Sequence, residues 1–190
     1  MAKTGERKAQ ILQTLAAMLE EPKGERITTA LLAARLEVSE AALYRHFTSK
    51  AQMFEGLIEF IEQTVFTLVN KIQVEEKDAM KQIESTIATL LGFAQKNPGM
   101  TRVLIGDALV NEDERLQSRV NQLLDRLEAT LRQSARLGVT AGVFPGDWDV
   151  NAYANAIIAF VVGRWHQYAK SGFKRAPLEG WPQQWRFFAA

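Results

Sequence analysis

The chain has 190 residues, a hydrophobic fraction of 47% and a formal net charge of +1. This length and composition predict a folded protein with one ordinary domain and a small one, and the near-neutral total charge gives no sign of a polyanionic partner. The absence of cysteine excludes disulfides, zinc–thiolate sites and thiol catalysis. There is no run of eighteen apolar residues, and residues 1–10 are too polar for a signal peptide, so we expect a cytoplasmic protein without membrane association.

Apolar residues recur at helical spacing almost throughout the chain, and breaks containing proline or glycine separate the segments. The pattern therefore predicts an all-α protein: three short helices, a long connecting helix, then a bundle. The breaks lie at residues 22–24, 97–99, 142–146 and 177–182. The predicted helices span residues 7–20, 29–36, 40–47, 50–70, 79–96, 100–109, 112–137 and 150–171, and a terminal helix starts near Pro182.

Residues 27–47 carry the spacing of a helix-turn-helix motif. Ala33 supplies the small residue that lets two helices cross closely, and Val38 lies in a three-residue turn as its apolar member. Leu43 and Phe47 occupy the positions that must be buried on the second helix. The spacing indicates a compact pair of helices, a geometry that also occurs in bundles that do not bind DNA.

The same assignment leaves one face of the second helix directed outward, and that face enters the DNA major groove in helix-turn-helix proteins. It carries Glu40, Ala41, Tyr44 and Arg45. Arg45 can pair with a phosphate or with the acceptors of guanine. Groups that suit phosphate contacts are the hydroxyls of Thr28, Ser39 and Tyr44, the imidazole of His46 and the ammonium of Lys50. A basic arm that could follow the backbone or the minor groove comprises Lys3, Arg7 and Lys8.

Charge alone gives this assignment little support. Residues 1–50 contain eight Lys and Arg against six Asp and Glu. His46 could equally be an ordinary surface histidine.

A specific resemblance favours DNA binding. The residues Thr28-Thr29, Ala33, Val38-Ser39, Leu43 to Phe47, Ser49-Lys50 and Met53 resemble the DNA-binding domain of TetR-family regulators. The resemblance implies a helix-turn-helix domain over residues 1–50 and a helical dimerisation and partner- or ligand-binding domain over residues 51–190. It implies contacts to double-stranded DNA at Thr28, Thr29, Ser39, Glu40, Ala41, Tyr44, Arg45, His46 and Lys50.

The turn departs from that family at one position, because Glu37 stands where glycine is usual. A left-handed conformation costs glutamate about 1 kcal/mol more than glycine, which a domain tolerates. The carboxylate also places a negative charge near the phosphates.

Further segments resemble the nucleoid occlusion factors of Gram-negative bacteria, a group with the same fold. They are residues 38–47, 53–54, 57–62, 91–93, 97–102, 116–123 and 173–177. The resemblance implies a homodimer that binds palindromic chromosomal sites, often as two dimers per site, and that antagonises the division GTPase FtsZ, so that septum assembly over the nucleoid is blocked. By position, the FtsZ contact would include Phe60, Gly92, Lys96 and Asn97. The plainer alternatives are core packing for Phe60 and a simple turn at residues 97–99.

A ligand-released repressor is the alternative within the same fold, and it would need an apolar cavity with a few polar groups. Candidate lining residues are Thr86, Thr89, Trp148, Tyr153, Trp165, His166 and Tyr168. Large aromatics at helical spacing are more often core. For an enzyme we find no phosphate-binding loop, no metal motif and no nucleophile with a base, so we expect no catalytic residue, metal or cofactor. The acidic run at residues 112–114 is expected to be a solvated helix start.

Residues 152–168 are apolar over most of the helix circumference, which predicts burial on more than one side. We expect the second side to meet another chain in a two-fold dimer, with heads about one DNA turn apart. The predicted interface comprises Ile157, Phe160, Val161 and Trp165. The aromatic residues Trp181, Trp185, Phe187 and Phe188 are expected to cover the same seam.

Overall fold

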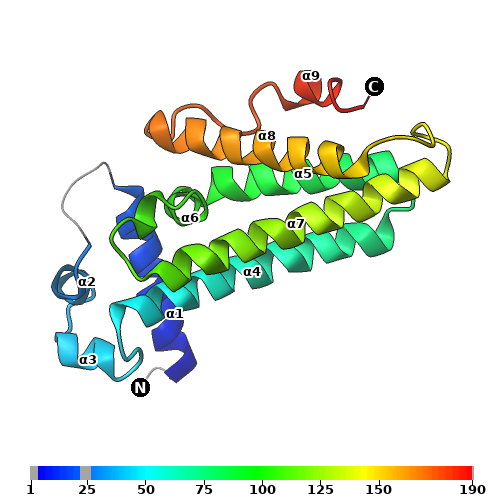
Figure 1. Ribbon diagram of the computed structural model, residues 1–190. Helices are drawn as coiled ribbons and strands as arrows, with labels where there is room; N and C mark the ends of the chain where they lie inside the picture. Colours follow the sequence, from blue (N-terminus) through cyan, green and yellow to red (C-terminus); the bar gives the residue numbers. More distant parts are fainter. Residues whose placement is uncertain (1–3, 22–26, 190) are drawn as a thin grey trace. The chain divides into compact units, whose positions relative to one another are not determined.

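A computed structural model describes residues 4–21 and 27–189, and all regular structure within these ranges is helical (Figure 1). The elements in chain order are α1 (Thr4–Glu20), α2 (Thr29–Arg35), α3 (Glu40–Tyr44), α4 (Lys50–Glu75), α5 (Ala79–Lys96), α6 (Pro98–Leu104), the 3-10 helix η1 (Asp107–Leu109), α7 (Glu114–Thr140), α8 (Val150–Lys170) and α9 (Trp181–Trp185). The predicted all-α class is confirmed. None of the helices in the described ranges has the length and apolar character needed to cross a membrane.

The chain divides into two compact units. Unit 1 comprises residues 1–61 and 97–120, and unit 2 comprises residues 62–96 and 121–190. The long helices α4 and α7 contribute residues to both units. The functional boundary that the sequence places after residue 50 stays a prediction.

Unit 1 is built on α1, whose apolar positions repeat at helical spacing. Ile11, Leu15 and Leu19 are almost completely buried, as an amphipathic helix requires. Helix α6 packs along α1, and Gly99 of α6 comes so close that an added Cβ would lie 2.0 Å from the carbonyl oxygen of Ala16. Only glycine therefore permits this crossing.

The C-terminal end of α1 is held by a side chain from α6. The Arg102 guanidinium donates to the carbonyl oxygens of Leu19 at 3.1 Å and Glu21 at 3.4 Å, and it pairs with Asp107 at 2.8 Å. The last carbonyls of a helix have no partner within the helix and carry partial negative charge, so a cation here satisfies both needs.

In unit 2, α5 and α8 lie side by side (Figure 1). Their contact includes Trp165, which is 1% exposed and donates its indole N–H to the carbonyl oxygen of Leu90 at 3.2 Å. The C-terminal segment (residues 171–189) is fixed by Arg164, which donates to the carbonyl oxygens of Ala176, Pro177 and Glu179.

Several helix boundaries differ from those expected. The single helix predicted over residues 100–109 is instead α6 followed by η1, because Gly106 adopts a left-handed backbone (φ 78°) between them. The second helix of the helix-turn-helix ends at Tyr44 rather than residue 47, and α4 continues to Glu75 rather than residue 70.

Candidate nucleic-acid interface

The two short helices α2 and α3 begin at the predicted caps. The Thr28 hydroxyl oxygen accepts from the amide of Leu31 at 3.2 Å, and that of Ser39 accepts from the amide of Ala42 at 3.3 Å. These bonds satisfy amides that a helix start leaves without partners. Each hydroxyl accepts through its oxygen and donates to no acceptor among the described residues, so its own proton could bond a phosphate.

The turn between α2 and α3 forms as the sequence predicts. Glu37 adopts the left-handed conformation (φ 55°), and the amide of Val38 donates to the carbonyl oxygen of Ala33 at 3.0 Å. Ala33 is 3% exposed and Leu43 is 1% exposed, so both predicted packing positions are buried. The turn therefore fixes the angle at which α3 leaves α2.

Helix α3 presents its predicted outer face to solvent. Glu40, Ala41, Tyr44 and Arg45 are all exposed, while Phe47, beyond the helix, is buried. The hydroxyl of Thr29, in the first turn of α2, donates to a carboxylate oxygen of Glu40 at 2.6 Å. This exposed face is the one available to a nucleic acid.

Lys50 is paired with an acidic side chain and does not offer the free cation that a phosphate contact needs. Its ammonium lies 2.5 Å from a carboxylate oxygen of Glu112 and above the ring of Phe54. The carboxylate of Glu112 is only 10% exposed, so the expectation of a fully solvated acidic run at residues 112–114 is wrong for this residue. Its partner, 62 residues earlier in the chain, could not be identified from local sequence.

The remaining predicted basic and imidazole contacts are placed as follows. His46 is partly buried, and its Nδ1 is buried with no hydrogen-bond partner among the described residues, so only its other ring nitrogen could reach a phosphate. Lys8 lies 5.5 Å from the ring centroid of Phe47, and the Arg7 guanidinium donates to Gln10. Lys3 lies outside the described residues.

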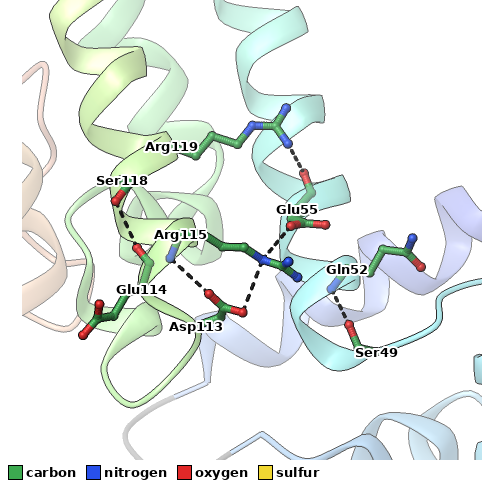
Figure 2. A network of polar contacts seen from close by, with 8 residues as sticks. All are labelled: Ser49, Gln52, Glu55, Asp113, Glu114, Arg115, Ser118 and Arg119. Atoms are coloured by element: carbon green, nitrogen blue, oxygen red, sulfur yellow. Dashed lines mark hydrogen bonds and ion pairs between the residues drawn. The ribbon is translucent and has the colours of Figure 1, made fainter.

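A polar network joins the N-terminal turns of α4 and α7 within unit 1 (Figure 2). Arg115 pairs with Glu55 at 2.9 Å and with Asp113 at 3.3 Å, and Arg119 donates to the carbonyl oxygen of Glu55 at 3.5 Å. These residues could not be identified from the sequence, because their spacing resembles that of ordinary solvated helix positions. The network fixes the start of α4, which directly follows the helix-turn-helix.

Two of the residues predicted to contact FtsZ lie in unit 1. Phe60 is on α4 and is 47% exposed, so the alternative of core packing is wrong for this side chain. Asn97 precedes α6, and its carbonyl oxygen accepts from the amide of Thr101 at 2.9 Å. Asn97 thus has the backbone role of a helix start.

The other two residues predicted to contact FtsZ, Gly92 and Lys96, lie in unit 2 on α5. Lys96 is exposed in the last turn, where a cation suits the helix C-terminus. Gly92 is partly buried, and an added Cβ would lie 3.7 Å from Leu178 in the C-terminal segment.

Three of the four residues predicted to form the dimer interface lie in the core of the single chain. Ile157 and Val161 are 0% exposed and Trp165 is 1% exposed within the single chain, so these three are core residues of unit 2. Phe160 is partly buried, with ring centroids of Trp181 and Phe188 at 6.0 and 5.1 Å. The second apolar side of α8 is thus covered by the chain's own C-terminal segment.

The face of α8 that remains exposed includes Ala152, Asn155, Ala156 and Ala159. The dimer itself stays a prediction.

Three of the aromatic candidates for a ligand cavity are buried and bonded to backbone carbonyl oxygens. Trp165 is bonded to Leu90 as described, and the Tyr168 hydroxyl donates to the carbonyl oxygen of Gln95 at 3.1 Å. Tyr153 donates to the carbonyl oxygen of Phe188 at 2.7 Å, and burial raises the pKa of its phenol.

Comparisons with known proteins agree with these features. The profile for bacterial regulatory proteins of the tetR family matches residues 11–57, and the profile for the tetracyclin repressor-like C-terminal domain of SlmA-like proteins matches residues 77–190. The chain is 50% identical to the nucleoid occlusion factor SlmA of Marinomonas sp., over 98% of this chain and 95% of that protein. It is 51% identical to the SlmA of Alteromonas mediterranea, over 96% and 93% of the two chains.

Solved structures show the same fold at low sequence identity. A TetR transcription regulator from Haloarcula marismortui superposes with a TM-score of 0.81 at 18% identity, covering 97% of each chain. The TetR-family regulator PfmR from Thermus thermophilus gives a TM-score of 0.78 at 24% identity, covering 95% of this chain and 97% of that one.

Proposed function

Because the chain belongs to the TetR family of bacterial regulatory proteins, and within it to the group of the nucleoid occlusion factor SlmA, we propose that it binds palindromic chromosomal sites as a dimer and inhibits FtsZ-dependent septum assembly over the nucleoid. The observation that carries this proposal is identity of about half the residues over nearly the whole length, covering both the DNA-binding part and the C-terminal domain. The TetR family is one of DNA-binding regulators, and the proposed action of this protein is likewise binding, to DNA and to FtsZ.

The exposed face of α3 supports the DNA-binding step. Arg45 offers a cation to guanine or phosphate, and the caps Thr28 and Ser39 each retain a proton for a phosphate oxygen. The ion pair of Lys50 with Glu112 makes a phosphate contact by Lys50 less favourable, because binding would have to separate a largely buried pair.

For the dimer, we propose a two-fold contact through the exposed face of α8. The small side chains of Ala152, Ala156 and Ala159 would let a second helix approach closely. Ala156→Arg is expected to give a monomer in sedimentation velocity, and Ser85→Arg on the exposed side of α5 is the matched control. A variant of Ala156 that stays dimeric contradicts this surface.

For the FtsZ contact, we propose Phe60, Gly92, Lys96 and Asn97. The large exposed area of Phe60 and the exposed cation of Lys96 support a surface role. Lys96→Glu should retain DNA binding and lose inhibition of FtsZ assembly in a sedimentation assay. Lys81→Glu makes the same charge change on the exposed side of α5 and should keep both activities.

The experiment that tests the whole proposal is a genome-wide map of bound sites by crosslinking and immunoprecipitation. Many palindromic sites spread over the chromosome and sparse near the replication terminus are expected. One or two sites at promoters, beside the protein's own gene above all, would instead identify a local repressor and direct the search toward a ligand.

A further inference from the structure

A short chain of hydrogen bonds joins the first turn of α2 to the exposed face of α3. The Tyr44 hydroxyl donates to the Thr29 hydroxyl oxygen at 3.5 Å, and the Thr29 hydroxyl donates to a carboxylate oxygen of Glu40 at 2.6 Å. The first bond is weak by its length and the second is short and charge-assisted. Glu40 is thus held at its position by a residue eleven places earlier in the chain.

These bonds determine which groups keep a proton for DNA. A hydroxyl has one proton, and the Thr29 hydroxyl donates its proton to the Glu40 carboxylate. The hydroxyls of Thr28 and Ser39 instead accept from backbone amides and donate to no acceptor in the described part of the chain. Thr29 therefore differs from the two caps, because its proton is bonded to Glu40 and is not available to a phosphate.

Glu40 is the first residue of α3, the part of a recognition helix that lies nearest the base edges. Its carboxylate can only accept hydrogen bonds, and one oxygen is left for a donor in the groove. Cytosine N4 and adenine N6 are the donors that the major groove offers, whereas guanine and thymine present acceptor oxygens there. A carboxylate opposite such an oxygen is repelled.

We propose that Glu40 is a base-selecting residue that accepts from the N4 amino group of a cytosine at one position of each half-site, and that Thr29 is its positioning residue. This inference rests on the proposed binding of DNA by α3. Among the two possible bases, a single acceptor suits cytosine better, because adenine places a second acceptor, N7, beside its amino group.

A carboxylate in the first turn of a helix also favours the helix dipole, and this structural role is the competing account of Glu40. The two accounts differ in what they predict for base preference. A structural role affects stability and affinity for all duplexes alike, whereas a base contact affects one position of the site.

The test is selection of bound duplexes from a randomised pool by the full-length protein, followed by affinity measurements on sites with each base at the selected position. Glu40→Gln should lower the preference for cytosine ~10-fold and raise that for adenine, because a glutamine amide bonds both N6 and N7 of adenine. The matched control is Glu37→Gln in the exposed turn of the same motif. Both variants remove one negative charge near the phosphates and should gain affinity for nonspecific DNA equally, but Glu37→Gln should keep the cytosine preference.

Thr29 is tested with a pair of variants of similar size. Thr29→Val removes the hydroxyl and should reduce the preference at the same position about fivefold, the scale of one hydrogen bond. Thr29→Ser keeps the hydroxyl and should retain the preference. Circular dichroism of each variant checks that the motif is folded.

A wild-type protein that selects a defined palindrome, together with Glu40→Gln that selects the same bases with the same strength, overturns the inference and leaves DNA binding intact. Wild-type protein that selects no sequence overturns the proposed function itself.

Discussion

Gly99→Ala tests the close packing of α6 on α1. The added Cβ would lie 2.0 Å from the carbonyl oxygen of Ala16, 3.0 Å from its carbonyl carbon and 3.1 Å from the Cβ of Leu19. Carbon and oxygen atoms without a bond between them need about 3.2 Å, so the two helices would have to separate by roughly 1 Å. The obstacle is the backbone of α1, and no change of rotamer can relieve it.

Excess volume in a well-packed core costs about 1–3 kcal/mol when side chains can adjust. Because backbone must move here, we expect the upper end of that range, about 3 kcal/mol. A chain of this size loses about 2–4 °C in Tm per kcal/mol, which gives a drop of roughly 6–12 °C. The shift would also disturb the bonds of Arg102 to the end of α1, so DNA affinity should fall as well.

Urea unfolding and thermal melts followed by circular dichroism would measure this change, with protein concentration held constant because association shifts apparent stability. Gly5→Ala is the matched control, since an added Cβ at Gly5 of α1 meets no atom of the described residues within 4 Å. That variant should be as stable as the wild type or slightly more stable. A Gly99→Ala protein with wild-type Tm and wild-type DNA affinity would refute the packing argument.

Three further predictions follow from contacts of single side chains. Arg164→Met should lower the free energy of unfolding by about 2 kcal/mol and speed hydrogen exchange in the C-terminal segment, because three carbonyl oxygens lose their donor; unchanged exchange there would contradict this. Burial raises the pKa of Tyr153 above the ordinary value of about 10, so the unfolded chain releases this proton first and stability should fall as pH rises above about 10. Tyr153→Phe should reduce that fall, and identical urea midpoints against pH for both proteins would argue against it. Lys50→Gln and Glu112→Gln should each destabilise by about 1–2 kcal/mol with strong coupling in a double-mutant cycle. A shallower salt dependence of DNA binding in Lys50→Gln, but not in Glu112→Gln, would instead show that Lys50 contacts a phosphate.

The parts of the fold that depend on near neighbours could be predicted from the sequence. Thr28 and Ser39 cap their helices within three residues, and the left-handed conformation of Glu37 is the one expected where the resembled family usually has glycine. Helix α5 has the predicted bounds because both ends carry local signals, with a break of Pro and Gly directly after it.

The parts that depend on distant residues could not be predicted. The ion pair of Lys50 joins residues 62 positions apart, and the cover over Phe160 comes from the end of the chain. A helix that is apolar all round looks the same in sequence whether its own chain or a second copy covers it. For that reason the sequence predicts an interface at Ile157, Val161 and Trp165, which the structure places in the core.

The bond of Arg102 to the end of α1 affects the order in which the nascent protein can fold. Arg102, which bonds the end of α1, lies about 80 positions later in the chain. The ribosome must therefore synthesise α6 before the first helix has its final partners. Translation proceeds at about 5–20 residues per second, and the helix-turn-helix lacks this support for several seconds after it has emerged. We therefore expect unit 1 to mature late, when more than half of the chain already exists, and a fragment that ends shortly after α3 to fold poorly by itself.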